Sequence, residues 1–183
     1  MKIIVGMTGA SGSSFGVEFM KTCPGEKYLL ISRWGKSVLA QETGLTLDDL
    51  APYAKKVFSN EDLSSPFASG ANSFDAMVIV PCSASTLSKI ACGIADSLMT
   101  RAAAVALKER RKLILCLRET PLSTILLENM LKVSQAGAIV MPISLPFYQE
   151  AKDLQGMARL FAERIVQLID PQTSATGWKT EAL

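Results

Sequence analysis

The fold is decided by one stretch of the chain, Leu113-Ile114-Leu115-Cys116-Leu117-Arg118-Glu119-Thr120-Pro121. Its first five residues are all apolar, and so short and uniform a run is typical of a strand buried on both faces of a parallel sheet. A helical segment follows over residues 122–130. Arg118 and Glu119 therefore lie at the carboxyl end of a core strand, where open α/β sheets bind ligands. Two charges left there are expensive unless they are paired or used, so we expect function at this edge.

Strand and helix patterns alternate along the rest of the chain. Residues 44–73 are polar and contain Pro52, Pro66 and Gly70, so we expect them to be irregular, and we expect Pro81 to stop the third strand. The alternation predicts a single α/β domain over residues 1–183 with a mainly parallel sheet, and a tail from about residue 171. Strands are expected at 2–7, 27–32, 76–80, 113–117 and 138–141, and helices at 13–22, 34–42, 84–92, 97–110, 123–135 and from 154 to 168.

The composition is that of a globular protein, with 49% hydrophobic and 20% charged residues. A formal charge of +2 is too small to indicate nucleic-acid binding. No apolar run approaches the roughly 20 residues that span a bilayer, and the N-terminus reads as a strand rather than a signal peptide. The cysteines show no C-x-x-C spacing, which favours reduced, buried thiols in a cytoplasmic protein; they are Cys23, Cys82, Cys92 and Cys116.

The chain contains no histidine. Histidine is the usual base at neutral pH and the commonest metal ligand, so Ser-His-Asp catalysis, Cys-His catalysis and histidine-containing metal sites are excluded. Any proton transfer must therefore use carboxylates, lysine, tyrosine, serine or groups of the substrate itself.

Two strand-to-helix turns are rich in small and hydroxyl residues. The first, Thr8-Gly9-Ala10-Ser11-Gly12, has the character of an anion-binding loop, although Gly6, Gly9 and Gly12 lack the G-x-G-x-x-G spacing of dinucleotide sites. A tight turn with Ser11 or Ser13 as helix cap is the alternative. The second is Ser83-Ala84-Ser85-Thr86. Two such turns at one sheet edge can cradle a phosphate and an attached ring, which favours a ligand site.

Further cationic and aromatic residues are candidates for the same site. Arg101 and Lys108 are seven residues apart, hence on one helix face and roughly 10 Å apart. Most of the run 108–112 is equally well explained as a solvated helix end. Tyr148 follows the 138–141 strand and so belongs to the same sheet edge, but a tyrosine that only packs over the protein surface is the alternative. Arg164, taken alone, is a surface residue. Trp178 can anchor the tail or cap an apolar pocket.

Taken together, these segments resemble the UbiX-type flavin prenyltransferases, within a wider fold group that includes the flavin-containing cysteine decarboxylases. The resemblance implies a Rossmann-like or flavodoxin-like three-layer sandwich. The matching stretches follow one another in order over nearly the whole chain; they are residues 6–12, 30–43, 68–93, 101–115, 118–131 and 146–148.

The resemblance implies a specific, metal-independent reaction. Such enzymes bind reduced FMN, transfer a dimethylallyl group from dimethylallyl phosphate to flavin N5 and close a fourth ring at C6. The product, prenylated FMN, serves UbiD-type decarboxylases. The resemblance also implies a homo-oligomer, a dodecamer, with active sites completed across subunits.

Residue roles carry over by matching motif. The residues implied to hold FMN are Gly9, Ala10, Ser11, Ser32, Ser83, Ala84, Ser85, Thr86 and Arg118. Those implied to bind the prenyl phosphate are Arg101, Lys108, Tyr148 and Arg164, with Trp178 lining the prenyl pocket. The catalytic set is Ser11, Glu42, Glu119 and Lys108.

The implied chemistry agrees with these residue types. Cations can stabilise a departing allylic phosphate without a metal, and an aromatic pocket suits an allylic cation. The phosphate can itself accept protons, with Glu119 as a relay; a structural ion pair between Glu119 and Arg118 is the alternative. One departure stands out, because this chain has Leu126 where the family usually carries histidine. We expect altered local hydrogen bonding there rather than loss of the site.

Two other kinds of protein compete with this interpretation. A flavin-dependent cysteine decarboxylase resembles the same fold but uses an active-site histidine and a PASANT-like segment, where this chain reads Pro81-Cys82-Ser83-Ala84-Ser85-Thr86. A non-catalytic FMN-binding protein, such as a flavodoxin-like carrier, needs no cluster of cations beside the flavin.

Overall fold

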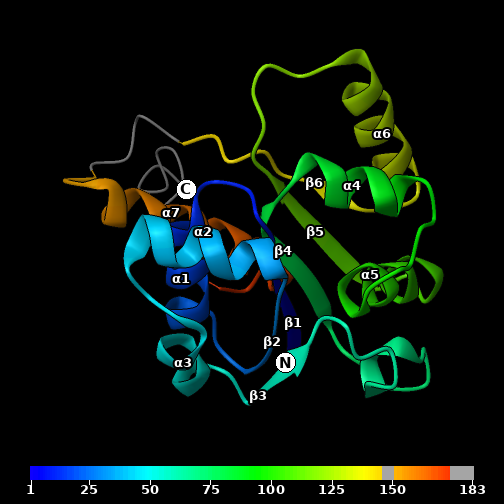
Figure 1. The fold of residues 1–183 in the computed structure, drawn as a ribbon, viewed down its shortest axis with the longest axis horizontal. Coiled ribbons are helices and arrows are strands. Elements are labelled where there is room, and N and C mark those ends of the chain that lie inside the picture. Colours follow the sequence, from blue (N-terminus) through cyan, green and yellow to red (C-terminus); the bar gives the residue numbers. More distant parts are fainter. Residues whose placement is uncertain (146–150, 174–183) are drawn as a thin grey trace.

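A computed structural model describes residues 1–145 and 151–173 of the chain. Within these ranges the strands form one parallel sheet of order β3-β2-β1-β4-β5-β6, with helices on both faces (Figure 1). This confirms the predicted three-layer α/β sandwich. The strands are β1 (Lys2–Met7), β2 (Glu26–Ile31), β3 (Lys56–Ser59), β4 (Ala76–Cys82), β5 (Lys112–Leu117) and β6 (Ile139–Val140).

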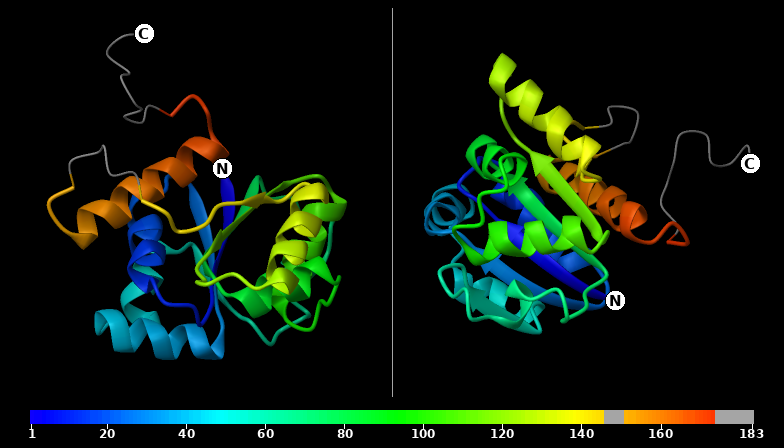
Figure 2. Two further views of the ribbon diagram at one scale, coloured as in Figure 1. Left: turned by 90° about the horizontal axis from the view of Figure 1, so that it is seen from above. Right: turned by 90° about the vertical axis from the view of Figure 1, so that its right-hand side faces the viewer.

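Alternate residues of each strand enter two separate hydrophobic cores. Ile114 and Cys116 pack with α1 (Ser13–Thr22) and α7 (Leu154–Ile169) on one face, and α2 (Arg33–Thr43) adds Leu39 to the same core. On the other face, Leu113 and Leu115 pack with α4 (Ala84–Ala91), α5 (Leu98–Lys108) and α6 (Thr124–Gln135). The views in Figure 2 show these helix layers on either side of the sheet. The stretch 113–117 is therefore buried on both faces, as its composition predicts.

Two details differ from the sequence-based expectations. Residues 44–73 are not irregular throughout, because they contain α3 (Leu47–Leu50) and the edge strand β3, together with two short 3₁₀ turns. β3 is only four residues long and pairs with β2 alone, so its hydrophobic signal is weak. Pro81 does not stop the third strand, since β4 continues to Cys82 with a register irregularity between Ile79 and Cys82.

The topology fixes where a ligand can bind. β1 pairs with β2 on one side and with β4 on the other, so the chain reverses its direction of strand addition between β1 and β4. Ligands of open α/β sheets bind beyond the carboxyl ends of the strands at such a reversal. The segments at that edge include the turns after β1, β2, β3, β4 and β5.

None of the helices in the described ranges is long and apolar enough to cross a membrane.

Candidate functional site

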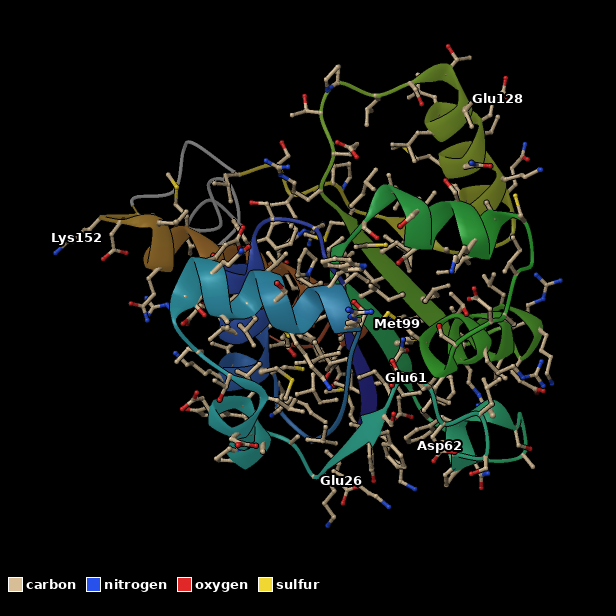
Figure 3. All side chains as sticks on the ribbon, viewed as in Figure 1. Glu26, Glu61, Asp62, Met99, Glu128 and Lys152 are labelled. Atoms are coloured by element: carbon tan, nitrogen blue, oxygen red, sulfur yellow. The ribbon has the colours of Figure 1, made fainter. Side chains whose placement is uncertain are left out.

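A pocket of about 480 Å³ lies at the carboxyl ends of β1, β2, β3 and β4. Glu61 and Met99, two of its lining residues, are labelled in Figure 3. The lining is largely composed of small hydroxyl and amide side chains, which suits a polar, hydrogen-bonding ligand. The lining residues are Thr8, Gly9, Ser32, Trp34, Asn60, Glu61, Ser83, Ser85, Thr86, Lys89, Asp96, Ser97, Met99 and Thr100.

The N-termini of α2, α4 and α5 meet at this pocket. Each helix is capped by a serine that lines it: Ser32 accepts a hydrogen bond from Gly35 N (3.0 Å), Ser83 from Thr86 N (3.3 Å) and Ser97 from Thr100 N (3.3 Å). The positive ends of the helix dipoles therefore point towards one cavity, which favours an anionic group there.

Gly9 belongs to the first turn and lies directly beneath Trp34. A Cβ atom on Gly9 would come within 2.5 Å of Trp34 Cβ, so only glycine fits at this position. The Trp34 side chain is two-thirds exposed and borders the pocket. Close approach of the backbone, rather than a dinucleotide motif, explains the glycine in this turn.

The N-terminus of α1 is capped by a side chain from α2. The Glu42 carboxylate accepts hydrogen bonds from Gly12 N (2.9 Å to Oε2) and Ser13 N (2.8 Å). Gly12 is the N-cap residue and no side chain caps from that position, so capping by Ser11 or Ser13 is wrong. The Ser13 hydroxyl is buried and has no hydrogen-bond partner among the described residues.

These contacts set the ionisation of Glu42. Partial burial tends to raise its pKa, but the neighbouring Ser11 hydroxyl and the N–H groups of Ser13 and Gly12 outweigh that effect and hold the pKa below the usual glutamate range. Glu42 is therefore an ionised acceptor at neutral pH, close to Ser11 and tied to the first turn.

Arg118 and Glu119 lie at the expected edge of the sheet, but they are not buried there. Both are exposed in the single chain, and no ion pair joins them among the contacts of the described residues. Neither charge is buried, so the predicted cost of burying two charges at this edge does not arise. The Arg118 N–H donates to Cys82 O (3.0 Å), which fixes the end of β5 to the end of β4.

Glu119 borders a second, smaller pocket that touches the first. This pocket has a volume of about 340 Å³, and Ser85 lines both cavities. Glu119 Oε1 accepts a hydrogen bond from Thr120 N (3.0 Å), which leaves the carboxylate at the surface of the pocket. The carboxylate thus lies next to the hydroxyl-rich turn of α4.

Leu126 lines the same second pocket from α6. Its side chain is buried and belongs to the core cluster that contains Leu87 and Val133, and its N–H donates to Ser123 Oγ (3.2 Å). The leucine side chain offers no hydrogen-bonding group to this pocket, and its effect on the site stays a prediction.

Of the predicted phosphate-binding cations, Arg101 and Lys108 lie beside the segment of residues 68–70, whereas Arg164 lies on α7, on the other face of the sheet. Arg101 Nε donates to Ala68 O (2.9 Å), and Arg164 donates to Gln167 Oε1 (2.6 Å) on α7. Lys108 pairs with Glu109 and is the last residue of α5, about 12 Å along the helix from Thr100 in the pocket.

The surroundings of Lys108 confirm that it lies at the opposite edge of the sheet. A Cβ atom on Gly70 would contact Lys108 Nζ, so the two residues are neighbours. Gly70 lies in the segment that leads into the amino end of β4. The phosphate-binding role of Lys108 stays a prediction that needs a second copy of the chain. The predicted Tyr148 and Trp178 lie outside the described residues.

Several lining residues were missed by sequence reasoning. Asn60 lies in the segment that was expected to be irregular. Its backbone carbonyl accepts a hydrogen bond from Leu98 N (2.7 Å), and its side-chain Oδ1 accepts one from Met99 N (3.1 Å). These two hydrogen bonds anchor the N-terminus of α5. Ser97 had a usable signal, because Ser97-x-x-Thr100 forms a capping box before an apolar helix. Lys89 and Asp96 had no signal, because only tertiary structure brings them to the pocket.

Comparison with known proteins agrees with this geometry. The sequence profile of the Flavoprotein family matches residues 1–173. The flavin prenyltransferase UbiX of Thermoplasma acidophilum is 46% identical over 92% of this chain and 94% of its own. The mitochondrial flavin prenyltransferase PAD1 of Saccharomyces cerevisiae is 40% identical over 90% of this chain and 69% of its own.

Solved structures agree as well. AnUbiX (PadA1), crystallised with FMN and dimethylallyl pyrophosphate, superposes with a TM-score of 0.91 at 36% identity over 97% of this chain and 98% of its own. A dodecameric FMN-dependent UbiX-like decarboxylase from Escherichia coli O157:H7 gives 0.89 at 37% identity over 96% and 100%. The cysteine decarboxylase TvaF gives 0.64 at 19% identity over 81% and 91%, a likeness in fold alone.

The fold and the pocket thus define a member of the Flavoprotein family. Within it, the chain belongs to the UbiX-type flavin prenyltransferases.

We predict that Glu42→Ala destabilises the protein at neutral pH by about 1 kcal/mol, the usual contribution of a helix N-terminal cap. Because the pKa of Glu42 is lowered in the folded state, its contribution is complete above the usual glutamate range and is lost as the pH falls through the folded-state pKa. The melting temperatures of wild type and variant should therefore differ at neutral pH and converge at acidic pH, below the folded-state pKa of Glu42.

The matched control is Gln41→Ala, a change at the neighbouring exposed position of α2. It should leave the melting temperature near that of wild type at both pH values. A Glu42→Ala deficit that is the same at neutral and acidic pH would show that the charge of the carboxylate is not what stabilises α1.

Proposed function

We propose that this protein is a flavin prenyltransferase that joins a dimethylallyl group from dimethylallyl phosphate to N5 and C6 of reduced FMN. The observation that carries the proposal is the pocket at the carboxyl edge. Its lining includes Gly9, Ser32, Ser83, Ser85 and Thr86, all of which were expected to hold FMN from the family resemblance. The complex of AnUbiX with FMN and dimethylallyl pyrophosphate supports the same assignment.

The chemistry of the pocket fits FMN. The hydroxyl groups and helix N-termini of Ser32 and Ser83 suit a phosphate and a polyol chain. Trp34 and Met99 offer aromatic and thioether surfaces to an aromatic ring. A volume of about 480 Å³ lies within the range of small-molecule sites.

Glu119 and Ser11 would act at the reacting centre. Glu119 borders the second, smaller pocket, which shares Ser85 with the main pocket, and it has solvent access, so its carboxylate can accept the proton that leaves the flavin and pass it on. Ser11 is held in the first turn beside the ionised Glu42, which favours a positioning role for Glu42. Arg118 would hold the flavin from the end of β5.

The prenyl phosphate would be bound by more than one subunit. Lys108 lies at the sheet edge opposite to the pocket, so a second copy of the chain must supply the lysine if it binds this phosphate. α6 exposes a row of apolar side chains suited to burial between copies, among them Ile125 (72% exposed) and Leu131 (58% exposed). The dodecameric Escherichia coli relative supports a homo-oligomer, and we propose a dodecamer here.

We further propose that the product passes to a UbiD-type decarboxylase and that the protein works in the cytoplasm. All four cysteines are free rather than disulfide-bonded, as is usual in a reducing compartment. Burial raises the pKa of Cys23 and of Cys82 to about 12, so these two thiols stay protonated at neutral pH. Cys92 is exposed, so the expectation of buried thiols is wrong for that residue.

Anaerobic incubation with reduced FMN and dimethylallyl phosphate tests the reaction. The flavin released from the protein should gain the mass of one five-carbon prenyl unit, as measured by mass spectrometry. An unchanged flavin mass from protein that is loaded with FMN would contradict the transferase assignment. Parallel incubation with the diphosphate identifies the donor that this chain uses.

Glu119→Gln should keep FMN bound but slow prenylation by about a hundredfold or more, because the amide cannot accept a proton. Single-turnover formation of the prenylated flavin gives the rate, and flavin absorbance gives the occupancy. Asp48→Asn, at an exposed carboxylate on α3, is the matched control and should react at the wild-type rate. Wild-type turnover by Glu119→Gln would remove Glu119 from the proton path.

A further inference from the structure

Lys89 is the only cationic side chain among the described residues that line the main pocket. Glu61 and Asp96 line it too, so the charged lining carries one positive and two negative side chains. Lys89 Nζ lies 2.6 Å from Asp96 Oδ2, and about half of each side chain is exposed. The pocket that is expected to hold a dianionic phosphate ester thus keeps its one cation in an ion pair with a carboxylate.

The helix geometry places Lys89 with the hydroxyl groups that cap α4. Lys89 follows Ser85 by four residues and Thr86 by three, so the three side chains share one face of the helix. All three line the pocket. A flexible lysine on this face can reach an anion beside the α4 N-terminus by side-chain rotation alone.

Asp96 has a second partner that would remain if Lys89 moved away. Its Oδ1 accepts a hydrogen bond from Thr100 Oγ1 (3.3 Å), and its side chain is about half exposed to solvent. Losing Lys89 would therefore leave Asp96 hydrated and hydrogen-bonded rather than buried without a partner. The ion pair between Lys89 and Asp96 can break at small cost.

We propose that Lys89 exchanges Asp96 for the phosphate of FMN and so makes the pocket select FMN over riboflavin. This inference rests on the proposed function, because it assumes that the pocket binds a flavin. When Lys89 moves from Asp96 to the phosphate, its positive charge faces the dianionic phosphate instead of the singly charged Asp96 carboxylate. The repulsion between Asp96 and the phosphate is thereby reduced. Lys89 is thus a specificity-determining residue that takes no part in prenyl transfer.

The test compares equilibrium binding of FMN and of riboflavin, which lacks the phosphate, to the full-length protein. Lys89→Gln should weaken FMN binding by about tenfold and change riboflavin binding by less than about twofold. Asp96→Asn should bind FMN at least as tightly as wild type, because it removes the competing anion. Lys55→Gln is the matched control: this lysine pairs with Glu26 (3.3 Å), near the amino end of β2, and its loss should affect neither ligand.

The outcomes separate the inference from the proposed function. If Lys89→Gln weakens the binding of FMN and of riboflavin equally, the residue maintains the pocket and does not recognise the phosphate. That result overturns the inference but not the flavin site. Unchanged FMN binding would also overturn it. Failure of the wild-type protein to bind either flavin would overturn both the inference and the proposed function.

Discussion

The site depends on one buried hydroxyl group, that of Thr8. Its Oγ1 donates to Pro81 O (2.8 Å) and accepts from Ser83 N (2.8 Å), while the Thr8 N–H also donates to Pro81 O (3.2 Å). The side chain is almost fully buried, so these hydrogen bonds are shielded from water. They fasten the end of β1 to the end of β4 at the point where the strand order reverses. The turn that carries Gly9 and the turn that caps α4 are consequently held in one fixed relation.

The helix N-termini near this link are of two kinds: one is capped by a carboxylate of the chain, and the others face the pocket. The N-terminus of α1 is already neutralised by Glu42, whereas α2, α4 and α5 direct their N-termini into the pocket. An anion entering the pocket therefore finds oriented N–H groups and hydroxyls that need no rearrangement. Glu119 stands just outside, at the neighbouring cavity, where it can exchange protons with solvent. The main pocket and the cavity that Glu119 borders thus share Ser85, in the first turn of α4.

Much of this arrangement could be predicted from the sequence, because local patterns carry it. The apolar run 113–117 predicted a doubly buried strand, and the two hydroxyl-rich turns predicted the sheet edge at which the pocket lies. Arg118 and Glu119 are exposed in the single chain, so the cost of burying charge is not what marks this edge. Asn60 and Lys89 could not be predicted, because their positions depend on how β3 and α4 pack in three dimensions. The position of Lys108 could be predicted, because it comes just before β5, and a residue that leads into a strand of a parallel sheet lies at the amino-terminal edge, opposite to the pocket.

Amide hydrogen exchange with and without FMN tests most directly whether the linked turns form the flavin site. The account predicts slower exchange in peptides that cover residues 8–12 and 83–86, with no change in residues 69–72 at the opposite edge. A separate cavity is lined by Glu18, Asp153 and Gln155. Protection confined to that cavity, with unchanged exchange at residues 8–12 and 83–86, would contradict the central claim.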